Sequence, residues 1–290
     1  MGKVILSYIA IAASICVGTY ALFNMSYEAE QESRGIFSWQ KNVFADSGAE
    51  LFLFMQEHGF TELYQWFSSE LDDLAAAEFL NSAHNAGIDT YILTGGPSWA
   101  KDSSGEKHLK AVERAVRIAG SPERKIKGIV FDVEPHTLEE WGDPTNRGRL
   151  MASFADGMKA AYKAAANRGF EVIVCIPNHY DDSGYFSELQ TLVSYADRVA
   201  VMNYARGSED VRIETEAGYA KKFGKGIINI YEFNPPGHYG IEEGNTYYFV
   251  GFDAALLNFR ELAKAYQDTR MTMAAHDYEI LKELLKQGLD

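Results

Sequence analysis

The sequence predicts an α/β protein built as a single (β/α)8 TIM barrel over residues 35–290. Strand-like apolar runs and helical segments alternate eight times along this region, and such alternation is typical of a parallel sheet. The region also has the usual length of a closed eight-stranded barrel. A doubly wound sheet is the alternative. It normally needs a Gly-rich phosphate-binding turn after the first strand, where Phe37–Lys41 reads FSWQK.

The eight expected strands are short runs enriched in β-branched and aromatic residues. In chain order they read GIFSW (35–39), TELYQW (61–66), DTYILTGG (89–96), KGIVFDVE (127–134), FEVIVCIPN (170–178), DRVAVMNYA (197–205), KGIINIYEF (225–233) and RMTMAA (270–275). The fourth begins as a buried apolar run and ends in two carboxylates, which makes its end a candidate site.

A helix is expected after each strand, where the pattern changes from strand-like to helical. Glycines that follow three of these segments, Gly87, Gly169 and Gly224, are typical of helix C-termini. In chain order the helices are expected at residues 47–58, 71–86, 106–119, 147–168, 185–195, 214–223, 253–267 and 278–287.

The charge balance argues against nucleic acid as a partner. Lys and Arg number 27 against 41 Asp and Glu, so the formal net charge of −14 would repel phosphates. An acidic chain suits a neutral or cationic substrate. The two cysteines, Cys16 and Cys175, form no CxxC or Cys/His pattern and are not expected to pair. No resident metal and no cofactor are predicted.

The N-terminal segment is expected to meet a membrane. Lys3 precedes an uncharged apolar run, Val4–Phe23, that is long enough to span a bilayer. The positive flank is the N-terminal one, which places the rest of the chain outside the cytoplasm. Residues 1–25 are predicted to be a signal anchor or a cleaved signal peptide, with a buried helix as a third alternative, and residues 26–34 are predicted to be an acidic linker.

Aromatic residues follow several of the expected strands. In a (β/α)8 barrel the loops at the C-terminal ends of the strands carry the chemistry. The candidates at this rim are Trp39, Trp66, Trp99, Trp141 and Tyr180, to which Tyr204, Tyr231, Phe233, Tyr239 and Tyr278 add. Trp39 and Trp66, each taken alone, could simply cap the barrel core. Together the candidates suggest a surface for sugar rings, because aromatic faces bury apolar area while a polar edge stays wet.

Two carboxylates leave the fourth strand together. Side chains alternate along a strand, so Asp132 and Glu134 are expected to point into the barrel with Val130, while Phe131 and Val133 face the helices. Two carboxylates this close disfavour simultaneous ionisation, so one pKa rises. A carboxylic acid that stays protonated near neutral pH can act as a general acid.

Other strand ends add polar groups to the same rim. Alternation directs Met202 and Tyr204 of the sixth strand into the cavity. Glu232, at the end of the seventh, is expected to be either catalytic or a partner of Arg206. The remaining candidates are Asn178 and His276. His276–Asp277 is equally compatible with a helix N-cap, and a divalent ion held by Asp132, Glu134 and Asn178 is a further alternative.

These residues resemble the motifs of glycoside hydrolase family 18, which carries DGxDxDxE on strand four and MxYD on strand six. Here Lys127–Glu134 reads KGIVFDVE and Met202–Ala205 reads MNYA, so several motif aspartates are missing. The family's strand-eight tryptophan is absent as well. The resemblance implies that Glu134 protonates the glycosidic oxygen. It also implies that Asp132 orients a substrate acetamido group acting as nucleophile, and that Tyr204 hydrogen-bonds to this group.

A second resemblance is to clan A glycosidases, which place Asn-Glu, often followed by Pro, at strand four and a nucleophilic Glu at strand seven. Val133–Pro135 reads VEP, and Glu232 stands at the seventh strand end. Retaining chemistry of this type implies that Glu134 and Glu232 lie about 5 Å apart. The family 18 pattern is preferred because it accounts for Asp132 and for Met202 and Tyr204.

The sequence therefore predicts a glycoside hydrolase that acts on an extracytoplasmic oligosaccharide or polysaccharide, with Glu134 as general acid. A carbohydrate-binding pseudoenzyme of the same fold, a clan A-like glycosidase and a metal-dependent hydrolase of an ester or amide are the alternatives. No protein partner is indicated.

Overall fold

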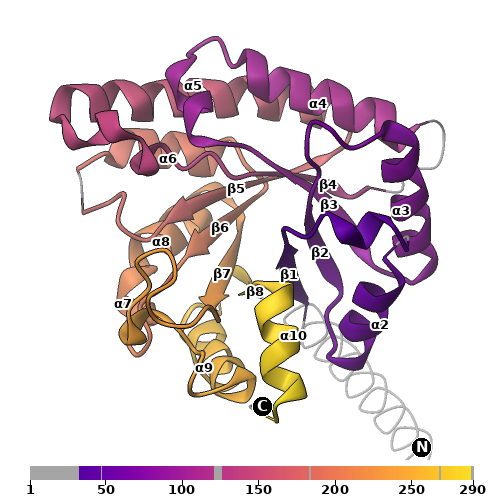
Figure 1. Ribbon diagram of the computed structural model, residues 1–290. Coiled ribbons are helices and arrows are strands. Elements are labelled where there is room, and N and C mark those ends of the chain that lie inside the picture. The colour runs from indigo at the N-terminus through magenta and orange to yellow at the C-terminus, as the bar shows by residue number, and fades with distance from the viewer. Residues whose placement is uncertain (1–32, 47, 121–125, 183, 268, 289–290) are drawn as a thin grey trace, which may run out of the picture. The chain divides into compact units, whose positions relative to one another are not determined.

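The computed structural model describes residues 33–46, 48–120, 126–182, 184–267 and 269–288. Within the compact unit Arg34–Asp290, eight parallel strands close into a barrel (Figure 1). The expected signal or anchor segment, residues 1–25, lies outside the described residues. No helix among the described residues has the length and hydropathy needed to cross a membrane.

The strands follow one another around the barrel in chain order. They are β1 (Arg34–Ser38), β2 (Glu62–Trp66), β3 (Asp89–Thr94), β4 (Gly128–Phe131), β5 (Glu171–Pro177), β6 (Arg198–Met202), β7 (Gly226–Glu232) and β8 (Arg270–His276). The barrel closes where β1 pairs with β8 in parallel, with Gly35 opposite Ala274. This arrangement confirms the predicted eight-stranded parallel barrel.

A helix follows every strand, as expected from the sequence. The main helices are α2 (Ala49–Glu57), α3 (Asp73–Asn85), α4 (Glu106–Ala119), α5 (Pro144–Ala166), α6 (Phe186–Ser194), α8 (Glu214–Phe223), α9 (Phe252–Ala265) and α10 (Tyr278–Lys286). Short elements in the loops are η1 (Asn42–Phe44), η2 (Pro97–Lys101), η3 (Pro135–Thr137), η4 (Glu139–Gly142), α7 (Glu209–Arg212) and η5 (Glu243–Asn245). Aspartate side chains cap the N-termini of α3, α5 and α10.

The strands separate two apolar cores. Ile129, Phe131 and Val133 belong to the larger core between barrel and helices. Val130 belongs to the smaller core inside the barrel, together with Tyr64 and Cys175. The alternation predicted for the fourth strand is thus confirmed for these residues, because neighbouring side chains of a strand point to opposite faces.

A buried ionic cluster fills the N-terminal end of the barrel. Arg198, the first residue of β6, pairs with Glu62 at 2.8 Å and with Glu171 at 2.6 Å. Its guanidinium also donates a hydrogen bond to the Tyr91 hydroxyl at 2.6 Å. Tyr64 donates to Glu62 at 2.5 Å. This cluster joins four strands at the end of the barrel opposite the strand C-termini.

The fourth strand is shorter than the predicted range 127–134. It ends at Phe131, although the Asp132 N–H still donates to the Thr94 carbonyl at 2.9 Å. Glu134 then adopts a left-handed backbone conformation, with φ 50° and ψ 55°, and Pro135 opens η3. A residue with positive φ cannot continue a strand, so the extended run stops before the second carboxylate.

Candidate active site

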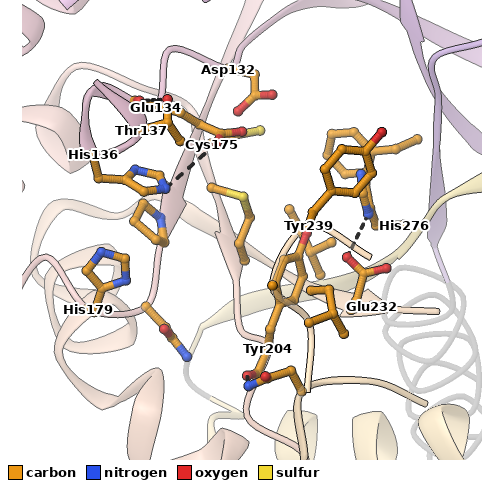
Figure 2. Close-up of a pocket in the computed structure, with 18 of the residues that line it drawn as sticks. Asp132, Glu134, His136, Thr137, Cys175, His179, Tyr204, Glu232, Tyr239 and His276 are labelled. Atoms are coloured by element: carbon orange, nitrogen blue, oxygen red, sulfur yellow. Dashed lines mark hydrogen bonds and ion pairs between the residues drawn. The ribbon is translucent and has the colours of Figure 1, made fainter. Parts of the chain in front are cut away.

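A cavity of about 710 Å³ opens at the C-terminal ends of the strands. This is the end at which (β/α)8 barrels place their chemistry. Eight of the predicted site residues line it, namely Trp39, Asp132, Glu134, Asn178, Met202, Tyr204, Glu232 and His276. Figure 2 shows Asp132 and Glu134 on one side of this cavity and Glu232 with His276 on another.

Of the four tryptophans, all of which the structure describes, Trp39 alone lines the cavity. Trp66 packs against Trp39 with the two rings tilted by 35° and their centroids 5.3 Å apart. Trp99 lies in η2 and packs on His108 of α4 at 5.2 Å. These two indoles bury their area against neighbouring side chains, contrary to the expectation that all four tryptophans share one open rim.

Trp141 and Tyr180 are also turned away from the cavity lining. Their rings pack together with centroids 5.8 Å apart, and Tyr180 is fully buried. The Tyr180 hydroxyl contacts Nδ1 of His136 at 3.1 Å. This geometry therefore does not place Trp141 and Tyr180 against a substrate in the cavity, because their apolar faces pack against the core. Tyr231, Phe233 and Tyr278, which were also expected at the open rim, are each at most 3% exposed and belong to the same core.

Asp132 and Glu134 form a contacting carboxyl pair at the tip of β4. Burial, the charge of Glu134 and a hydrogen bond between the two carboxyl groups raise the pKa of Asp132 well above its usual range. Asp132 is partly exposed as a residue, but its Oδ1 atom is shielded from solvent and has no hydrogen-bond partner among the described residues. Asp132 therefore holds its proton to higher pH than a free aspartate does, and its Oδ1 atom is buried without a partner among the described residues.

Gly95 allows this pair to be placed so closely against β3. Its φ of 150° lies outside the range that other residues favour. A Cβ atom there would come within 2.0 Å of the Asp132 carbonyl oxygen. The TGG sequence that follows the third strand therefore lets the backbone of Asp132 approach.

His136 lies beside Glu134, although it was not among the predicted site residues. Its Nε2 atom lies 3.7 Å from Oε2 of Glu134, while Tyr180 holds the other ring nitrogen. Burial, together with the nearby His179, lowers the pKa of His136 to about 4, so the ring is neutral at neutral pH. Its place two residues after Glu134 was the available signal, but the turn that brings it back depends on the left-handed backbone of Glu134.

Both carboxylate oxygens of Glu232 are engaged by neighbouring groups. Its Oε1 atom accepts hydrogen bonds from the backbone N–H of Asn234 at 2.7 Å and from the Asn234 side chain at 2.8 Å. Its Oε2 atom lies 2.9 Å from Nδ1 of His276. Although burial alone would raise the pKa of Glu232, these contacts lower it. The proposed pairing with Arg206 is wrong, because Arg206 contacts Glu243 instead.

His276 links Glu232 to Trp39. Burial alone would lower its pKa, but the hydrogen bond and charge of Glu232 raise it to about 9. The Trp39 indole N–H lies 3.2 Å from Nε2 of His276 and can only donate, so it opposes a proton on that nitrogen. The neutral tautomer with its proton on Nδ1 satisfies both partners, and we assign it here because the indole contact is a direct geometric constraint. His276 thereby orients Trp39, while Asp277 caps α10.

Tyr204 lines the same cavity as Asp132, Glu134 and Glu232. Burial, Glu232, Glu134 and Asp132 all raise its pKa well above the usual value, so its hydroxyl is protonated and can donate. Asn178 is held by Asn203, to which it donates at 3.2 Å. Among the described residues, no group of three or more His, Cys, Asp or Glu side chains has a geometry suited to a metal ion.

Comparisons with known proteins identify the fold and leave the family open. No family model matches the sequence, and no curated protein matches it. A chitinase from Chromobacterium violaceum superimposes with a TM-score of 0.56 at 15% identity, over 89% of this chain and 98% of its own. A GH18 chitinase from Pseudoalteromonas aurantia gives 0.58 at 13% identity, over 88% and 99%. This chain therefore shares the (β/α)8 barrel fold of these two chitinases.

The same fold also occurs in proteins with unrelated functions. Tryptophan synthase from M. tuberculosis superimposes with a TM-score of 0.51 at 11% identity, over 91% of this chain and 90% of its own. One barrel architecture thus serves unrelated reactions, so function has to be argued from the side chains in the cavity.

Proposed function

We propose that the protein is a glycoside hydrolase that cleaves an oligosaccharide or polysaccharide, with Glu134 as the general acid. The contact between Asp132 and Glu134 inside the cavity carries this proposal. A carboxyl pair that shares a proton is suited to protonating a glycosidic oxygen. Trp39 offers the sugar an aromatic face. The uncharged segment Val4–Phe23 supports an extracytoplasmic substrate.

The reaction that suits these residues is assisted by the substrate. The proton that the pair shares passes to Glu134, which donates it to the glycosidic oxygen as the bond to the anomeric carbon breaks. The carbonyl oxygen of a substrate acetamido group attacks that carbon, and the Asp132 carboxylate accepts a hydrogen bond from the acetamido N–H. Tyr204 donates to the acetamido oxygen. Glu134, now ionised, takes a proton from the water that opens the cyclic intermediate.

The state of Glu232 favours this reaction over direct attack by a protein carboxylate. A nucleophile needs a free lone pair aimed at the anomeric carbon. Glu232 is 3% exposed, and both of its oxygens are engaged by Asn234 and His276. Its role is therefore to hold His276, and through it Trp39, rather than to form a glycosyl ester.

The proposal is tested by a screen of the wild-type chain and its Glu134→Gln variant against polysaccharides, with chitin-type and deacetylated polymers included. We expect the variant to lose about 10²–10⁴-fold in kcat while it still binds the polymer. A wild type that binds a polymer without hydrolysing it would support the pseudoenzyme alternative instead. Binding is measured by calorimetry and turnover by the release of reducing ends.

A further inference from the structure

The segment between β7 and α9 forms part of the cavity wall. Tyr239, Gly240, Ile241 and Asn245 of this segment line the cavity. Its tip is a tight turn in which the Gly237 N–H donates to the Ile241 carbonyl and the Ile241 N–H donates to the His238 carbonyl, each at 2.8 Å. Tyr239 stands at the apex of this turn.

The turn is fixed to the barrel beside the catalytic groups. The Asn245 side chain donates to the backbone carbonyl of Tyr204 at 2.7 Å. The Arg206 N–H donates to the Gly244 carbonyl at 2.8 Å. Asn245 also completes a capping box with Glu242. The apex is therefore held in place before any ligand arrives, which lowers the entropy lost on binding.

Tyr239 combines two features that neither packing nor solubility explains. Its side chain is 95% exposed although it lines a cavity. Its backbone has a φ of 48°, a left-handed conformation that is unfavourable for residues with a Cβ atom. Conformations of this kind persist where the surrounding structure imposes them, often at ligand sites.

We infer that Tyr239 forms an outer sugar-binding subsite at the mouth of the cavity, so that the substrate is an extended chain of sugars. The inference rests on the proposed function and adds an exposed aromatic face to that of Trp39 in one cavity. An exposed tyrosine presents a flat apolar face and a hydroxyl edge, which matches the C–H face and hydroxyl rim of a pyranose. A single glycosyl unit held at the carboxyl pair would leave this ring unused. Figure 2 labels Tyr239 among the residues of the cavity.

The test compares long and short substrates. The long substrate is the hexamer of the sugar whose polymer the wild type hydrolyses in the screen, and N-acetylglucosamine is tried first. The short substrate is the 4-nitrophenyl glycoside of the corresponding dimer. For Tyr239→Gly we expect the ratio of kcat/KM for the hexamer to kcat/KM for the dimer glycoside to fall about tenfold, because the stacking face is lost. Tyr239→Phe keeps the ring and should keep the ratio within about twofold of wild type.

Two controls make the result specific. Glycine adopts positive φ without strain, so Tyr239→Gly should melt no lower than wild type, which excludes misfolding as the cause. The matched control is Phe249→Ala, because Phe249 is 62% exposed on the same segment but does not line the cavity. We expect this variant to keep the wild-type ratio of hexamer to dimer kcat/KM. An unchanged ratio in Tyr239→Gly overturns the subsite and leaves the proposed function standing. A wild type that hydrolyses no polymer in the panel overturns both.

Discussion

Asp132 is the residue at which stability and chemistry conflict. Its folded-state pKa is raised by burial and by Glu134. Below the usual aspartate pKa of about 3.9, both the folded and the unfolded state are protonated at this residue, and no cost arises. As the pH rises through that value, the unfolded state releases the proton more readily, so the folded state loses stability.

Asp132→Asn should therefore stabilise the protein while it impairs turnover. We expect the free energy of unfolding to rise by about 0.5–2 kcal/mol at pH 7, and this gain to shrink toward zero at about pH 3.5. Urea unfolding across this pH range measures the effect. Glu113→Gln, on the exposed face of α4, is the control and should show little change at any pH. A stability gain that persists undiminished at acid pH would contradict the assigned pKa shift.

At the scale of elements, α4 and α5 meet through a glycine. A Cβ atom at Gly157 of α5 would lie 2.6 Å from the ring of His108 in α4. His108 is fully buried, and burial above all lowers its pKa to about 4. Neither of its ring nitrogens has a hydrogen-bond partner among the described residues. The ring acts as a neutral packing group, and the helix spacing depends on the missing side chain at Gly157.

Two glycine substitutions separate helix propensity from packing. In an exposed helix interior, alanine in place of glycine stabilises by about 0.5–1 kcal/mol. We expect this gain for Gly218→Ala in α8, where a Cβ atom would meet nothing within 4 Å. For Gly157→Ala we expect a loss of about 1–3 kcal/mol, because the ring must shift. Thermal unfolding measures the stability of both variants. Melting temperatures that shift in the same direction would contradict this account of α5.

The elements also show where sequence reasoning succeeds. Periodicity predicted all eight strand–helix pairs, because each pattern reflects which face is buried. It placed Asp132 and Glu134 at the correct strand end but extended β4 past Phe131. The left-handed turn at Glu134, and with it the position of His136, follows from packing between segments far apart in the chain. The inward packing of Trp99 and Trp141 has the same origin, and no local pattern reveals it.

For the whole barrel, the Arg198 cluster ties the N-terminal strand ends together. Arg198→Met would remove the cation beside Glu62 and Glu171, whose side chains are only 12% and 24% exposed, so we expect a loss of about 3–5 kcal/mol in unfolding free energy. Arg117→Met removes an ion pair with Asp73 in which the arginine side chain is 60% exposed, and should cost less than about 1 kcal/mol. Chemical denaturation measures both, and equal losses would show that the cluster contributes no more than a surface pair.

The segment between β7 and α9 is closed at its base as well as at its tip. The Thr246 hydroxyl donates to the carbonyl of Asn234 at 2.8 Å, and the Tyr247 N–H donates to the carbonyl of Glu232 at 2.8 Å. Residues 235–245 thus form a loop whose two ends are held together by hydrogen bonds next to the barrel. If the proposed function holds, exchanging residues 238–240 would change which polymers bind without altering the Asp132–Glu134 pair, a change open to natural divergence and to loop grafting alike.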